Sequence, residues 1–257
     1  MKKNVLLVGV GEMGGVFARG FLKIGYAIHP VLRDMSIEDV AKEVKEIEAI
    51  IVGVGEKDID PVLEIVPRKF QDKLILLQNE LLPHSWKKHG IEDPTVISVW
   101  FEKKKGQDYK VLIPSPVYGP KASLVKQALE SIDIAVTELD DEQQLLFELI
   151  VKNVYILTTN IVGLEVGGTV GELITENSQL TRSVADNVMD LQFKLAGQVL
   201  DKEDIFNAMI RAFEGDLDHK CMGRSAPGRL ERALKYADEL DISAVSLRKI
   251  YENYKIE

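Results

Sequence analysis

Six residues near the start of the chain form the glycine pattern G-x-G-x-x-G. They are Gly9, Val10, Gly11, Glu12, Met13 and Gly14. An apolar run precedes them and a helical pattern follows, which is the strand, turn and helix order that binds a dinucleotide. Gly9 allows a tight turn, Gly11 lets a pyrophosphate approach the backbone, and Gly14 lets the helix pack on the strand. We therefore predict a dinucleotide site here; a glycine-rich turn without a ligand is the alternative.

The residues at the end of the second predicted strand bear on the choice of cofactor. Leu32, Arg33 and Asp34 follow one another where this strand ends, and Arg33 lies 19 residues after Gly14. An arginine there pairs with the 2′-phosphate of NADP, whereas an acidic residue accepts hydrogen bonds from the ribose of NAD. Asp34 already stands in the turn, so the sequence favours NADP(H), with Asp34 as a ligand of NAD the alternative. Gly53 and Gly55 end the third predicted strand, and we expect them beside the cofactor or in a simple turn.

A lysine stands in the middle of an apolar helical segment that covers residues 145–159. The segment is apolar on nearly every side, as expected of a helix buried at a domain junction. Desolvation lowers the pKa of a buried lysine and makes it a usable proton donor or base. A catalytic role of this kind is one interpretation of Lys152. The other is a structural ion pair with Glu148, one turn earlier.

Short β-branched runs alternate with helical patterns in the first half of the chain. The predicted strands cover 4–10, 26–32, 49–54, 73–77, 96–101, 110–113 and 134–137, and the predicted helices cover 13–24, 36–47, 61–69 and 121–131. Such alternation predicts an α/β fold with a parallel sheet. Beyond residue 137 the pattern is nearly all helical. We expect a Rossmann-type cofactor domain over residues 1–138 and an all-helical domain over 139–257.

Composition and charge argue against several classes of protein. The chain has 257 residues, 41 acidic and 32 basic, and a net charge of −9, so we expect no nucleic acid or anionic lipid as a partner. Its one cysteine, Cys221, and four histidines show no zinc-ligand spacing, so we expect no metal. No apolar run reaches the roughly 18 residues of a membrane span. We therefore expect a cytoplasmic protein without a membrane segment. The three lysines at 103–105 lie between two predicted strands, and we expect them in a solvated hairpin turn.

Several motifs together resemble the ketopantoate reductase (2-dehydropantoate 2-reductase) family. Lys152, Ile156 and Asn160 stand at spacing i, i+4, i+8 along the apolar helix, and the row continues to a Gly-Glu-Leu turn. The family's catalytic lysine stands at the same separation from its Gly-Glu-Leu turn as Lys152 does from Gly171 here. The matching parts are the motif at 9–14, Arg33, Gln78-Asn79 after the fourth strand, and the helix from Lys152 through Asn160 to the turn at 171–173.

The resemblance implies an NADPH-dependent reductase of a small 2-keto acid, with 2-dehydropantoate the first candidate substrate. Lys152 then donates a proton to the carbonyl oxygen while the nicotinamide delivers hydride to the carbon. The resemblance makes Asn79 and Asn160 substrate-orienting residues in a cleft between the two domains. Glu231 takes the place of a glutamate that supports catalysis in the family. From the residues alone, Glu231 is equally a surface carboxylate and Asn79 equally a turn residue.

The chain also departs from the family pattern. Ile156 replaces a substrate-binding asparagine, Cys221 stands where the family has serine, and Gly55 occupies the place of a lysine, with Lys57 nearby. Loss of one amide changes which substrates such a site accepts. Two alternatives follow: a reductase of another carbonyl or imine on the same two-domain plan, and a non-catalytic NADP-binding regulatory protein. A homodimer is a further option that the sequence leaves open.

Overall fold

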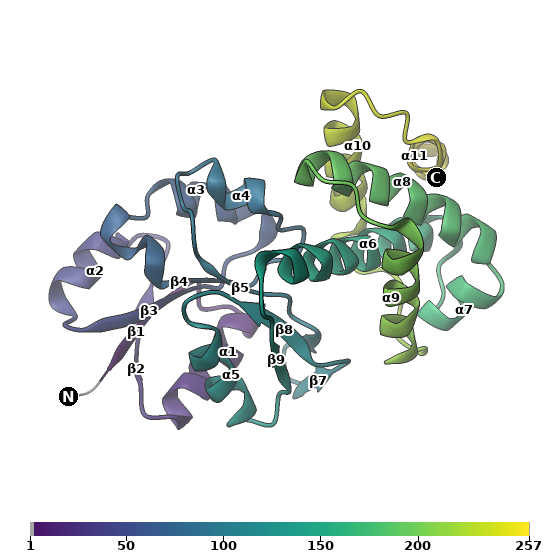
Figure 1. Cartoon of the computed structure of the whole chain (residues 1–257). Coiled ribbons are helices and arrows are strands. Elements are labelled where there is room, and N and C mark those ends of the chain that lie inside the picture. The colour runs from purple at the N-terminus through teal and green to yellow at the C-terminus, as the bar shows by residue number, and fades with distance from the viewer. Residues whose placement is uncertain (1–2, 257) are drawn as a thin grey trace. The chain divides into compact units, whose positions relative to one another are not determined.

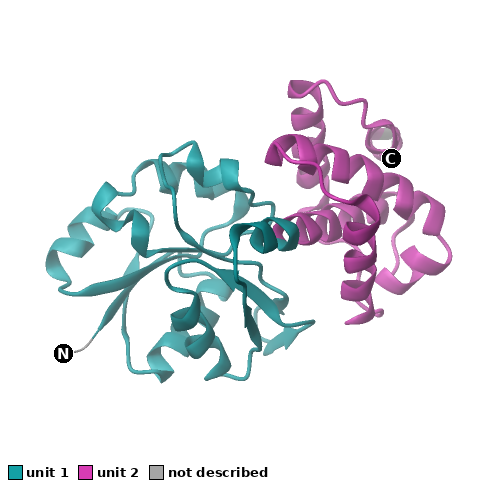
Figure 2. Cartoon of the chain, viewed as in Figure 1, with its two compact units in different colours: residues 1–148 teal, residues 149–257 magenta. Residues whose placement is uncertain are grey.

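A computed structural model describes residues 3–256 and divides into two compact units (Figure 2). The first unit ends at Glu148 and the second begins at Leu149. The sequence places the domain boundary ten residues earlier, after residue 138, at the end of the last strand. The units divide inside helix α6 (Glu142–Val166), because the first turns of this helix have their contacts in the first unit. The boundary at 138 stays a prediction.

The first unit is built around one seven-stranded sheet (Figure 1). Its strands are β1 (Asn4–Val8), β2 (Ala27–Val31), β3 (Ile47–Val52), β4 (Leu74–Leu76), β5 (Thr95–Ile97), β8 (Ser115–Tyr118) and β9 (Val136–Glu138). The order is β2-β1-β3-β4-β5-β8-β9, and all neighbours are parallel except β5 and β8. This arrangement confirms the predicted Rossmann-type α/β fold.

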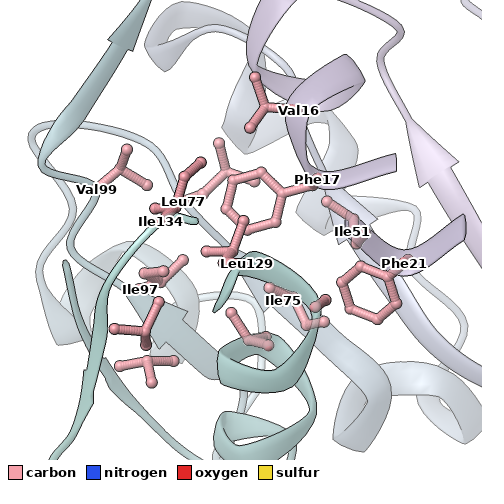
Figure 3. Packing of buried hydrophobic residues seen from close by; sticks show 14 of the residues in the cluster. Val16, Phe17, Phe21, Ile51, Ile75, Leu77, Ile97, Val99, Leu129 and Ile134 are labelled. Carbon is pink, nitrogen blue, oxygen red and sulfur yellow. The ribbon is translucent and has the colours of Figure 1, made fainter. Parts of the chain in front are cut away.

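Helices cover both faces of this sheet (Figure 1). One face carries α1 (Glu12–Lys23) and α5 (Ala122–Glu130), and the other carries α2 (Ile37–Glu43), α3 (Ile59–Glu64) and α4 (Pro83–Lys87). Under α1 and α5, Phe17 and Phe21 pack with Ile51, Ile75 and Leu129 in a core from which water is excluded (Figure 3). The spacing of the two phenylalanines places them on one side of α1, and their burial fixes α1 on the sheet.

Some short elements differ from the predicted ones. The strand predicted over 96–101 is two pieces, because the chain leaves the sheet after β5 and forms an antiparallel hairpin of β6 (Phe101–Lys103) and β7 (Tyr109–Val111). The lysine run does lie at this hairpin, as predicted. The helix predicted over 61–69 ends at Glu64, before Pro67. Strand β8 was not predicted, because it contains a proline, which single-sequence patterns count against a strand.

The second unit confirms the predicted all-helical region. Its elements are most of α6, then α7 (Val170–Thr175), α8 (Ser178–Ala196), α9 (Lys202–Glu214), α10 (Ala226–Glu239) and α11 (Val245–Ile256). The Gly-Glu-Leu segment forms the first turn of α7, where Thr169 and Glu172 cap each other's backbone amides. Of the described helices, only α6 is long and apolar enough to cross a membrane, and 83% of its apolar window is buried, as in a core helix.

Gly14 and Gly15, adjacent in α1, differ in how closely other atoms approach them, so alanine at each position tests a different effect. A Cβ on Gly14 would lie 2.5 Å from the carbonyl oxygen of Gly9, whereas one on Gly15 would meet nothing within 4 Å. We expect Gly14→Ala to lower the free energy of unfolding by about 1–3 kcal/mol because backbone must move. Gly15→Ala should raise it by about 0.5–1 kcal/mol. Urea unfolding of both variants checks this; equal effects would contradict the close contact.

Candidate functional site

The glycine turn after β1 brings the backbones of β1, β3 and α1 close together. Gly9 has a positive φ of 89°, which only glycine adopts readily. Gly14 and Gly53 both lie against the backbone of Gly9, so the start of α1 approaches β1 and β3 closely. Gly11 is different: it is exposed, and nothing lies within 4 Å of where its Cβ would be. Its backbone is therefore open to a ligand.

The N-terminus of α1 faces the same turn. Gly11 is the N-cap residue and has no side chain to hydrogen-bond the first amides of the helix. A helix end of this kind favours an anion. Glu12 introduces a carboxylate there, but Lys103 of the β6–β7 hairpin lies 3.2 Å from it and offsets the charge. The neighbouring Met13 packs against the hydrophobic core and helps to hold the turn in place.

A groove of about 750 Å³ opens at the carboxyl ends of β1, β2 and β3. In open α/β sheets, ligands bind at this kind of edge, where the strand order reverses around β1. Six of the predicted cofactor residues line it, namely Gly9, Val10, Gly11, Arg33, Gly53 and Gly55. Apolar residues that the sequence did not single out complete the walls, among them Leu32, Met35, Val54, Val62 and Ile65. No sequence pattern singled them out, since they come from the segment after β2, the segment after β3 and helix α3 with its C-cap residue, which are separate along the chain.

The two candidates for cofactor selection differ in position. Arg33 is exposed and lines the groove, and it has no ion-pair partner among residues 3–256. Asp34 is exposed as well but does not line the groove. Of the two candidates, Arg33 and not Asp34 thus lines the groove at the end of β2.

Gln78 and Asn79, the two residues that follow β4, differ in their surroundings. Gln78 is buried, and its amide donates hydrogen bonds to the carbonyl oxygens of Val52 and Val54, which ties β4 to the end of β3. Asn79 is half-buried, and its Nδ2 donates to Oε1 of Glu56 at 3.1 Å. Asn79 therefore lies at the carboxyl edge of the sheet. Glu56, which holds its amide, was not anticipated.

Lys152 lies in the second unit and is buried, with 9% of its surface exposed. Burial among apolar side chains and, to a smaller extent, the positive charge of Arg229 together lower the pKa of Lys152 to about 7. The ammonium group also lies 5.4 Å from the centre of the Tyr155 ring. A lysine with this pKa can hold or release a proton at neutral pH.

The structure brings Asn160 together with an arginine that the sequence did not suggest. Nη1 of Arg229 donates to Oδ1 of Asn160 at 2.9 Å, and both side chains are buried. A signal for this was present: Arg229 lies on the apolar stripe of α10 with Ala226, Leu230 and Ala233. A charged residue on such a stripe is held by a specific partner or serves a site.

Glu231, predicted as the supporting glutamate, lies elsewhere on α10. It is exposed and lines a shallow cavity between α10 and α11, with Lys235, Asp238 and Arg248 among its neighbours. The structure thus groups Lys152 and Asn160 with Arg229 and not with Glu231, whose role stays a prediction from the resemblance. Cys221, the serine replacement, is buried and donates from Sγ to the carbonyl oxygen of Gly167 at 2.9 Å. Within residues 3–256, no cluster of three or more metal-binding side chains occurs.

The chain thus joins a Rossmann-type α/β unit to an all-helical unit through the long helix α6, which defines a two-domain α/β-plus-helical class of fold. No protein-family model and no curated protein matches the chain. Solved structures do. A 2-dehydropantoate 2-reductase from Methylococcus capsulatus has 12% identity, coverage of 98% of this chain and 96% of that chain, and a TM-score of 0.72.

Two further structures show the same fold. A dimeric ketopantoate reductase from Staphylococcus aureus has 15% identity, coverage of 98% of both chains and a TM-score of 0.63. D-mandelate dehydrogenase in complex with NADH has 9% identity, coverage of 98% of both chains and a TM-score of 0.66. This chain therefore has the two-domain fold of the ketopantoate reductases, as the resemblance predicted.

The low pKa of Lys152 makes a prediction about stability. Between about pH 7 and the ordinary lysine value of 10.5, the unfolded chain binds a proton at this residue and the folded chain does not. The wild type should therefore gain stability relative to Lys152→Met as the pH rises from 7 to 10, by up to about 1.4 kcal/mol per pH unit. Urea unfolding of both proteins at several pH values measures this. A pH-independent difference would show that Lys152 stays charged.

Proposed function

We propose that the protein is an NADP(H)-dependent reductase of a small 2-keto acid, with 2-dehydropantoate the first candidate substrate. The observation that carries this proposal is Lys152, a buried lysine with a pKa of about 7 on the same helix face as Asn160. General acids work best when their pKa lies near the working pH. The shared fold of 2-dehydropantoate 2-reductases supports the same reading.

The groove of the first unit fits the cofactor. Gly11 leaves its backbone open to a pyrophosphate, and the end of α1 favours negative charge. Leu32 and Met35 on one side and Ile65 on another offer apolar surface for an adenine ring. Arg33 would pair with a 2′-phosphate, which supports NADP(H) over NAD(H). The nicotinamide, when bound, supplies the hydride.

The chain's own residues supply the rest of the chemistry. As hydride adds to the keto carbon, the C=O bond opens and its oxygen takes one proton from Nζ of Lys152, so that the product is a 2-hydroxy acid and the lysine is left neutral. Burial keeps water from competing for this proton. Asn79 and Asn160 would orient the substrate by hydrogen bonds from or to their amides.

The activity test uses NADPH oxidation with 2-dehydropantoate at 340 nm. Lys152→Ala should lower kcat by about 10²–10⁴-fold, because the general acid is lost, while the Kd for NADPH stays within twofold. In the wild type, kcat should fall as the pH rises above about 7, where Lys152 loses its proton. Lys235→Ala, an exposed lysine of α10, is the control. Unchanged turnover in Lys152→Ala would contradict the proposed role.

Cofactor choice is tested by fluorescence titration with NADPH and NADH. Arg33→Ala should weaken NADPH binding by about 10- to 100-fold, as expected for a lost charge-assisted pair, and leave NADH binding nearly unchanged. Asp34→Ala is the matched variant one residue on. If Asp34 is instead the ribose ligand, this variant alone will lose NADH affinity and the preference for NADP(H) will be wrong.

Ile156 favours a second candidate, a reductase of another carbonyl or imine on the same plan. It is half-buried on the face that carries Lys152 and Asn160, and it offers no hydrogen bond where the family has an amide. A panel of 2-keto acids and imines with NADPH distinguishes the two. Binding of NADPH without any turnover would instead support a non-catalytic regulatory protein.

The homodimer stays a prediction. Its support is that the Staphylococcus aureus ketopantoate reductase, which has the same fold, is dimeric.

A further inference from the structure

Arg229 and Asn160 form a buried polar pair between α10 and α6. Arg229 is 9% exposed and Asn160 is 6% exposed, and Nη1 of Arg229 lies 2.9 Å from Oδ1 of Asn160. The two residues are 69 positions apart in the sequence, so the contact depends on the packing of the two helices. Asn160 lies two turns after Lys152 on the same face of α6, about 12 Å along the axis.

The charge of Arg229 decides which way the amide of Asn160 points. A guanidinium group only donates hydrogen bonds, so it must face the amide oxygen and not the amide nitrogen. Nδ2 of Asn160 is thereby turned the other way. It makes one long contact, 3.4 Å, to Oγ1 of Thr159.

One N–H of Asn160 has no hydrogen-bond partner among residues 3–256. A buried donor without a partner is uncommon and costs stability. Such a donor in a candidate site points to a ligand atom that accepts a hydrogen bond. A carboxylate oxygen, a keto oxygen or a hydroxyl oxygen would each do so.

The positive charge of Arg229 narrows this choice to an anion. Arg229 contacts Asn160 and lies near enough to Lys152 to affect its ionisation, so a group beside Asn160 lies in the field of a buried guanidinium group. In a site screened from water, such a field favours a negatively charged group over a neutral one. The carboxylate of a 2-keto acid meets both requirements, because it accepts hydrogen bonds and is anionic.

We propose that Arg229 is the residue that makes the site selective for a carboxylate, by turning the N–H of Asn160 toward it and by supplying a fixed positive charge. Arg229 is thus a positioning residue, and Asn160 is the group that contacts the substrate. This inference rests on the proposed function. In this arrangement the carboxylate has a hydrogen-bond donor in Asn160 although Ile156 offers none.

The variant Asn160→Asp separates this role from a purely structural one. Aspartate keeps an acceptor for Arg229, so the tie between α6 and α10 survives, but it removes the N–H and adds a negative charge. We expect the melting temperature to match or exceed that of Asn160→Ala, while the KM for 2-dehydropantoate rises about 10- to 100-fold above the wild type. An unchanged KM in a folded Asn160→Asp variant would overturn the proposal.

A second series tests the charge of Arg229. The KM of the wild type, Arg229→Gln and Arg229→Lys is measured with the 2-keto acid and with its neutral primary amide. Arg229→Gln should raise the KM about 10- to 100-fold for the acid and less than about threefold for the amide, and Arg229→Lys should recover part of the difference. An equal loss for acid and amide would mean that Arg229 acts only in packing.

Ligand binding distinguishes failure of this inference from failure of the proposed function. Calorimetry with oxamate, an unreactive 2-keto acid analogue, and with neutral oxamide needs no turnover. Oxamate binding to the wild type that is lost in Asn160→Asp and Arg229→Gln supports the carboxylate site even if 2-dehydropantoate is not reduced. Equal oxamate affinity in all three proteins, or none in the wild type, overturns it.

Discussion

The close approach of three glycine backbones fixes how the first unit is packed around the end of β1. A Cβ on Gly14 would lie 2.5 Å from the carbonyl oxygen of Gly9, and one on Gly53 would lie 3.0 Å from the same atom. Because no side chain intervenes, α1 begins directly against β1 and β3. The groove, the open backbone at Gly11 and the direction of the α1 dipole all follow from this contact.

The helical half depends on one long helix that carries a charge in its buried part. Burial of α6 is what moves the pKa of Lys152 to about 7, so the packing that stabilises the unit also tunes the lysine. The cost of burying a second basic residue, Arg229, is offset in part by its hydrogen bond to Asn160. The packing of this unit and the proposed chemistry thus involve the same side chains.

The first unit uses a similar device, in which a charged residue fixes the direction of an amide. Glu56 accepts a hydrogen bond from Nδ2 of Asn79, as a carboxylate must, and leaves the amide oxygen of Asn79 to face other groups. In the second unit, Arg229 instead donates a hydrogen bond to the amide oxygen of Asn160. The two asparagines that the resemblance singles out therefore differ in which amide atom a charged residue holds, Nδ2 in Asn79 and Oδ1 in Asn160.

The sequence by itself determined the alternation of strands and helices in the first unit, the helical character of the second, the glycine turn and the apolar surroundings of Lys152, because periodicity and glycine conformation are local properties. It did not determine that the chain leaves the sheet after β5 to form a separate hairpin, since strand pairing depends on distant partners. Only the tertiary structure decided that Arg229, and not Glu231, is the charged residue of α10 beside Asn160. Side chains two positions apart on a helix point in different directions. Which of the two is buried depends on how α10 packs on α6.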